Sequence, residues 1–126
     1  MLLEIDFNSN SPIYKQIRDQ IIIGIAEGLL KKDENLPSVR QLSTRLGINM
    51  HTVNKAYKML EQEGWIGINK KRGTFINTKF GGNKDVFLEK FEENIKPLLA
   101  EAEILNIKKE TVLECIDKIM LNWGEW

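Results

Sequence analysis

The chain has 126 residues, 42% hydrophobic and 29% charged, with a formal net charge of zero, an ordinary composition for one globular domain or a small domain with an appendage. No apolar run approaches the roughly 20 residues of a membrane span, and the first residues lack the features of a signal peptide, so we expect a soluble, cytoplasmic protein with no membrane partner. One cysteine and one histidine argue against a disulfide within the chain, a metal site and acid–base catalysis, so we expect no enzyme and no cofactor.

The charges are unevenly distributed along the chain. Residues 1–78 contain eleven Lys and Arg against eight Asp and Glu, whereas residues 79–126 contain seven against ten. A basic portion can meet phosphates while an acidic portion stays away from them. The zero net charge therefore does not exclude binding to nucleic acid.

The first predicted elements are an extended arm and a core helix. Leu3, Ile5 and Phe7 alternate with acidic residues, which predicts an arm packed on the domain. We expect a helix to begin with Ser11 as its N-cap and Pro12 at its first position. Its broad apolar stripe consists of Ile13, Tyr14, Ile17, Ile21, Ile22 and Ile25. The polar connection over residues 29–36 leaves room for only a very short strand.

Residues 36–64 are predicted to form two short helices joined by a tight turn. Ser38 is the expected N-cap of the first helix, and Gly47, in a left-handed conformation, is expected to end it. Asn49 is the expected N-cap of the second helix. A connection of this length is typical of a helix-turn-helix.

The second of these helices, expected over residues 49–63, has two different faces. Its apolar arc consists of Val53, Ala56, Tyr57 and Leu60. Its outward arc consists of His51, Asn54, Lys55, Lys58 and Gln62. Such hydrogen-bonding and cationic groups can bind base edges and phosphates in a major groove. An ordinary amphipathic helix with a solvated polar face is the alternative interpretation.

Residues 65–78 predict a β-hairpin with a basic tip. The tip consists of Lys70, Lys71, Arg72 and Gly73, between strand-like segments at 65–69 and 74–78. Gly73 can take a positive φ and lets the backbone approach a phosphate surface closely. A solvated turn is the alternative for the tip alone, but directly behind a helix-turn-helix the hairpin indicates a wing.

Glycines at 81 and 82 indicate a flexible junction, which divides the chain into a DNA-binding domain at 1–79 and a helical tail at 80–126. The first tail helix carries apolar residues three and four apart, typical of a seam between helices: Leu88, Phe91, Ile95, Leu98, Ala102 and Leu105. A second helix from about Lys109 adds Ile116 and Ile119. A tail this short cannot enclose a large core, so we expect these eight residues to pair with a copy of the chain. Folding back on the first domain as a monomer is the alternative.

Residues 11–78 carry a dense set of motifs. These are Pro12-Ile-Tyr14-Lys-Gln16-Ile17, Gly28, Leu36-Pro37-Ser38-Val-Arg40-Gln-Leu42, Leu46-Gly47-Ile48, Thr52-Val53, Ala56-Tyr57, Leu60-Glu61, Gly64 and Gly73-Thr74-Phe75-Ile76. On these motifs the segment resembles the winged-helix domain of the GntR family of bacterial transcription regulators. The short tail is similar to that of the YtrA-like subfamily, in which it makes the dimer. The implied fold is mainly α with a small β-hairpin wing: a winged helix-turn-helix domain followed by an antiparallel two-helix tail.

The resemblance also implies which residues touch DNA. In the family these are the arginine matching Arg40, the first residues of the recognition helix and the wing glycine matching Gly73. Many members have an arginine directly after the recognition-helix cap, where this chain has Met50. The expected DNA-binding residues are Ser38, Arg40, Asn49, Met50, His51, Thr52, Asn54, Lys55, Lys58, Lys71, Arg72 and Gly73.

The function implied is that of a homodimeric regulator, expected to be a repressor, that binds a roughly palindromic operator in double-stranded DNA. A small-molecule effector is left open, because no residue pattern identifies one. The alternative is a winged-helix module that binds a protein partner, without DNA, through the same outward face.

Overall fold

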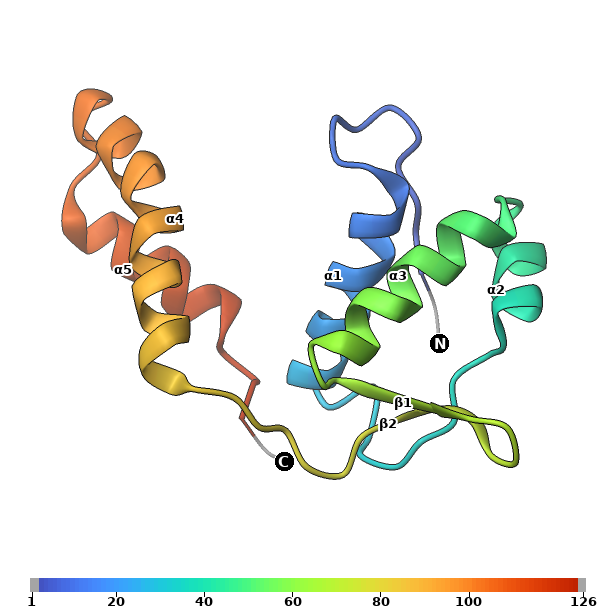
Figure 1. Ribbon diagram of the computed structural model, residues 1–126. Helices are drawn as coiled ribbons and strands as arrows, with labels where there is room; N and C mark the ends of the chain where they lie inside the picture. The colour runs from blue at the N-terminus through green and yellow to red at the C-terminus, as the bar shows by residue number, and fades with distance from the viewer. Residues whose placement is uncertain (1–2, 125–126) are drawn as a thin grey trace. The chain divides into compact units, whose positions relative to one another are not determined.

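The structure is a computed structural model that describes residues 3–124 (Figure 1). The described residues form five helices and one antiparallel pair of strands, so the predicted fold class is confirmed. The elements are α1 (Ile13–Ala26), α2 (Val39–Leu46), α3 (Met50–Gln62), β1 (Ile66–Asn69), β2 (Gly73–Ile76), α4 (Lys84–Ile104) and α5 (Lys109–Ile119). They divide into two compact units, and the chain passes from one to the other after Phe80.

Helix α1 buries the predicted apolar stripe but begins differently from the prediction. Ile17, Ile21 and Ile25 are buried. The N-cap is Pro12 and not Ser11, because Pro12 has an extended ψ of 148° and lies outside the helix. Among residues 3–124 no side chain caps this end of the helix. Instead, the carbonyl of Pro12 accepts hydrogen bonds from the N–H groups of Lys15 and Gln16.

The arm before α1 is attached by two glutamines of that helix. The N–H groups of Glu4 and Asp6 donate to the side-chain oxygens of Gln20 and Gln16, each at 2.9 Å. Leu3 and Ile5 pack against the core as predicted. The expectation for Phe7 is wrong: its side chain is 65% exposed, because the chain turns at this residue and the alternation ends at Asp6.

The helix-turn-helix forms with the predicted caps. Ser38 Oγ accepts from the Gln41 N–H at 3.1 Å, while Gln41 Oε1 accepts from the Ser38 N–H at 2.9 Å. This reciprocal pair satisfies two amides at the start of α2. Gly47 ends α2 with φ 66°, and Asn49 Oδ1 accepts from the His51 N–H at 2.7 Å to begin α3. Each boundary is set by hydrogen bonds between residues close in sequence.

The core of the first unit lies around α3, which packs against α1, α2 and β1. The predicted apolar arc of α3 is fully buried. Ile66 and Ile76, opposite each other in the two strands, close the core from the wing side. The connection at 29–36 contributes Leu30 and Leu36 to the core, and its very short strand is a single bridge from Asn35 to Phe75.

The second unit consists of α4 and α5, which form an antiparallel hairpin (Figure 1). Asn83 caps α4 by accepting from the N–H groups of Asp85 and Val86. Asn106, with φ 59°, lies in the turn between the helices. No residue of α4 or α5 is fully buried. No helix in the described part of the chain is long and apolar enough to cross a membrane.

Candidate nucleic-acid interface

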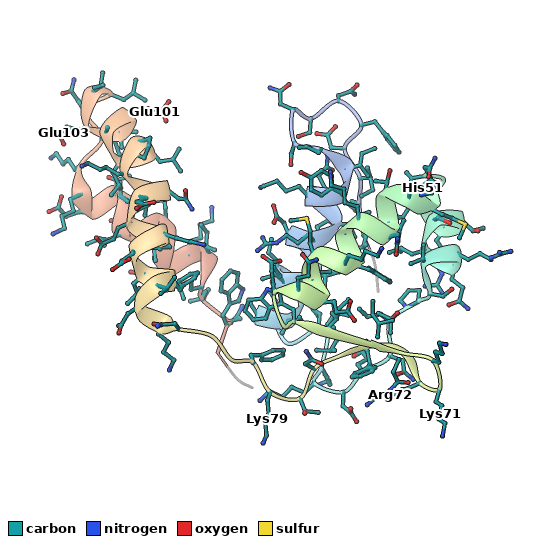
Figure 2. All side chains as sticks on the ribbon, in the orientation of Figure 1. His51, Lys71, Arg72, Lys79, Glu101 and Glu103 are labelled. Carbon is teal, nitrogen blue, oxygen red and sulfur yellow. The ribbon has the colours of Figure 1, made fainter. Side chains whose placement is uncertain are left out.

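The amino-terminal end of α3 is an exposed polar surface. Asn49, Met50 and His51 are exposed, and Thr52 and Asn54 are half-buried. Figure 2 shows His51 at this end of the helix. Exposed polar side chains at the positive end of a helix can bind phosphates and base edges. The structure therefore presents the first turn of α3 as the sequence predicted, with less access to Asn54 than expected.

The start of α2 adds an exposed cation to the helix-turn-helix. Ser38 and Arg40 are both exposed, although Ser38 Oγ is already engaged in its capping bond. The Arg40 side chain makes no hydrogen bond or ion pair with any residue from 3 to 124. Arg45, in the last turn of α2, is likewise exposed and was not among the predicted contacts. Because Arg45 is a cation on the polar face of a short amphipathic helix, the sequence could have added it to the predicted DNA contacts.

Tyr57 fixes the start of α2 to the middle of α3. Its hydroxyl donates to the Pro37 carbonyl at 2.7 Å, and the residue is fully buried. Burial raises the pKa of Tyr57 above its ordinary value, and the charge of Arg45 lowers it by a smaller amount. The hydroxyl therefore stays protonated and donating at neutral pH.

Two contacts with α1 hold α3 along its length. Arg18 makes a two-point ion pair with Glu63: Nε to Oε1 at 2.9 Å and Nη2 to Oε2 at 2.8 Å. The hydrogen bond to Glu63 raises the pKa of Arg18 despite the opposing effect of its burial. Lys55 Nζ lies 4.0 Å from the centre of the Tyr14 ring. Sequence reasoning found neither contact, because the partners belong to helices distant in sequence.

The lysines on the outward face of α3 therefore differ in their freedom. Lys55, a predicted DNA contact, rests its ammonium group on Tyr14 by a cation–π interaction. Lys58 is exposed and makes no ion pair within the described residues. Of the two, Lys58 has the side chain that can reach a phosphate without giving up an internal contact.

The wing presents Lys70 and Lys71 to solvent at the tip of the hairpin. Figure 2 shows Lys71 and Arg72 at this tip. Gly73 has φ 85°, and a Cβ at this position would meet no atom within 4 Å. Its backbone is therefore both left-handed and open to a ligand. Arg72 differs from the lysines because its guanidinium is paired with Asp33, with Nη1 and Oδ1 2.6 Å apart.

The exposed groups of α2, α3 and the wing are suited to binding a ligand. Among the described residues no three His, Cys, Asp or Glu side chains are grouped so that they could hold a metal ion. Exposed polar side chains, cations and an open glycine come from α2, α3 and the wing of one compact unit. Such a set can neutralise phosphates and hydrogen-bond base edges.

Comparisons with known proteins identify the family. Residues 13–76 match the family model "Bacterial regulatory proteins, gntR family". The chain is 36% identical over 122 residues to the HTH-type transcriptional repressor YtrA of Bacillus subtilis (strain 168). The matched segment covers 94% of this chain and 92% of that protein.

Two solved structures are similar. A transcriptional antiterminator from Listeria monocytogenes EGD-e has a TM-score of 0.86 and 28% identity, over 95% of this chain and 93% of its own. The DNA-binding domain of AraR in complex with operator ORX1 has a TM-score of 0.53 and 28% identity, over 59% of this chain and 95% of its own. The family match, the winged helix-turn-helix and the two-helix tail together show that the chain belongs to the GntR family of bacterial transcription regulators, with the YtrA-like members.

Proposed function

We propose that this protein represses transcription by binding, as a homodimer, to a roughly palindromic operator. The observation that carries the proposal is that the first turn of α3, Arg40 and the wing lysines are all exposed, on a fold shared with a domain crystallised on its operator. Repression is supported by the similarity, along nearly the whole chain, to YtrA, a transcriptional repressor. Bound protein would occlude a promoter and needs no catalytic step, so we propose no enzymatic activity and a place of action in the cytoplasm.

The dimer is proposed to form through the tail. Among the predicted seam residues, Leu88, Phe91, Leu98, Leu105, Ile116 and Ile119 are exposed, and Ile95 and Ala102 are half-buried. Apolar area of this extent favours burial against another surface. A second copy of the hairpin presents the same three-and-four spacing and is the partner we propose.

Salt dependence separates DNA binding from the alternative, a module that binds a protein partner. Binding to a fragment carrying the protein's own promoter should weaken with a log–log slope of about −0.9 per neutralised phosphate. Arg40→Ala should lower the affinity. A base contact would cost about 1–3 kcal/mol on the specific site alone, and a phosphate contact would lower binding to random DNA as well.

The matched control is Lys96→Ala, which removes an exposed cation from α4 in the other unit. Its affinity for the promoter fragment should equal that of the wild type. Wild-type affinity for Arg40→Ala, with its fold verified by circular dichroism, would contradict the proposed interface. Absence of salt-dependent binding to any duplex would contradict the function itself.

A further inference from the structure

The guanidinium of Arg72, at the surface of the first unit, is paired with a residue 39 positions away in the chain. Its Nη1 lies 2.6 Å from Asp33 Oδ1, and its Nη2 donates to the Asp33 backbone carbonyl. Its carbon Cζ lies 4.0 Å from the centre of the Phe75 ring. One carboxylate, one carbonyl and one aromatic face therefore contact the group, whose side chain remains 34% exposed, so its charge is already paired without any ligand.

The backbone of Asp33 is shaped for this contact. Asp33 has φ 69°, a left-handed conformation that is unfavourable for most side chains and that aspartate tolerates better than most. Its N–H donates to the Ile76 carbonyl at 2.9 Å, which ties the 29–36 connection to β2. In this conformation the carboxylate oxygen Oδ1 and the backbone carbonyl oxygen of Asp33 both reach Arg72.

The Phe75 ring supplies the third side of the contact and is itself immobilised. Phe75 pairs with Gly67 across the hairpin, and a Cβ on Gly67 would lie 2.5 Å from the ring. The ring therefore lies directly on the glycine backbone. The Arg72 N–H also donates to Asn69 Oδ1 at 2.7 Å, so backbone and side chain of Arg72 are both fixed.

We propose that Arg72 is a positioning residue, which latches the wing tip to Asp33 so that Lys70, Lys71 and the Gly73 backbone meet the phosphates. The sequence predicted a direct DNA contact for Arg72, and the latch replaces that role. This inference rests on the proposed function for its consequence on DNA, but the latch itself exists without DNA.

The charge balance favours the latch over a phosphate contact. If Arg72 moved to a phosphate, it would leave the Asp33 carboxylate unpaired close to a polyanion. Lys71 is exposed and makes no ion pair within the described residues, so it meets a phosphate without that cost. Lys71 should therefore account for counterion release at the tip, and Arg72 should not.

The first measurement is hydrogen exchange of the amides from residue 70 to 73 in the full chain without DNA. Arg72→Ala removes the whole latch and should speed this exchange by roughly fivefold, whereas Asp33→Asn removes the ion pair but keeps the backbone carbonyl and should speed it by roughly twofold. Lys71→Ala, the matched control on the same tip, should leave it unchanged. Wild-type exchange in both latch variants would overturn the proposal, whether or not the protein binds DNA.

The second measurement is the effect of Arg72→Ala on affinity for the promoter fragment across a salt series, in the wild-type and in the Asp33→Asn background. The latch predicts a loss of several-fold in the wild type with the salt slope unchanged, and a smaller loss in the Asp33→Asn background, where the ion pair is already absent. Lys71→Ala should lower the magnitude of the log–log salt slope by about 0.9. If Arg72→Ala instead lowers the magnitude of the slope by about 0.9 in the wild-type background, Arg72 is a phosphate ligand and the proposal is overturned. If the wild type binds no DNA, the proposed function fails and exchange alone decides the latch.

Discussion

Tyr57 shows how one buried side chain sets the geometry of the reading elements. Its hydroxyl donates to the carbonyl of Pro37, immediately before the cap of α2, while its ring lies in the core. A buried hydroxyl requires a partner, and a backbone carbonyl placed at 2.7 Å supplies it. The bond therefore links the entry of α2 to the middle of α3.

Tyr57→Phe should lower the free energy of unfolding at pH 7 by about 1 kcal/mol, because it removes one internal hydrogen bond and leaves the ring in place. The variant should also change the response to alkali. The pKa of Tyr57 is raised on folding, so its contribution is fully present below the unfolded pKa of about 10 and is lost as the pH rises above that value. Urea unfolding at pH 7, 10 and 11 checks both effects.

The wild type should lose more stability than Tyr57→Phe between pH 10 and 11. Both proteins carry the same lysines and the same Tyr14, so the difference between them isolates Tyr57. Equal losses over that interval would show that ionisation of Tyr57 is not coupled to folding.

The residues that could be predicted from the sequence are those whose partners lie close by in the chain. Ser38, Gly47 and Asn49 act within a few residues, and all three were predicted correctly. Ser11 was a local prediction and failed, because Pro12 carries the extended backbone conformation at the cap. The ion pairs of Arg18 and Arg72 join residues 45 and 39 positions apart, and no periodicity reports such partners.

At the scale of elements, α3 is attached to its surroundings at three places along its length. Lys55 contacts Tyr14 of α1, and Tyr57 bonds to Pro37, which precedes the cap of α2. Glu63, the C-cap of α3, pairs with Arg18. Contacts from separate elements oppose rotation of α3 about its own axis. The sequence predicted which face of α3 is buried, but the attachments depend on how α1 crosses it, which only the fold determines.

In the tail the three-and-four apolar spacing is clear from the sequence, but the surface that it packs against is a proposal. Leu98 lies in the predicted seam and is 65% exposed. Ile104, on the same helix, is 79% exposed and lies six residues further on, which at about 100° per residue is a different face. The two residues are therefore matched in exposure and differ in their relation to the seam.

Leu98→Glu should convert the dimer to a monomer, because a charge would be buried in the proposed seam. Ile104→Glu should remain a dimer. Sedimentation equilibrium of both full-length variants across a concentration series measures this. A dimeric Leu98→Glu protein would contradict the proposed seam. Dissociation of both variants would show that the tail associates without a defined face.

For the whole molecule, symmetry connects the dimer to the operator. A two-fold dimer places two copies of α3 in opposite orientations, which requires half-sites that are inverted repeats. The two helices can enter major grooves on one side of the duplex only if they lie about 34–36 Å apart, one helical turn, or a multiple of it. The glycines after Phe80 allow some adjustment of this distance, but the helical phase of the DNA remains the controlling variable.

The spacing between half-sites therefore tests whether a dimer reads both halves of one operator from one side of the duplex. A gel-shift titration at fixed salt would compare the native operator with versions carrying about five or about ten additional base pairs between the half-sites. We expect the half-turn insertion to abolish tight binding, because it places the half-sites on opposite faces, and the full-turn insertion to restore part of it. Equal affinity for the native and half-turn spacings would contradict the dimeric reading mechanism, even for a protein that binds DNA.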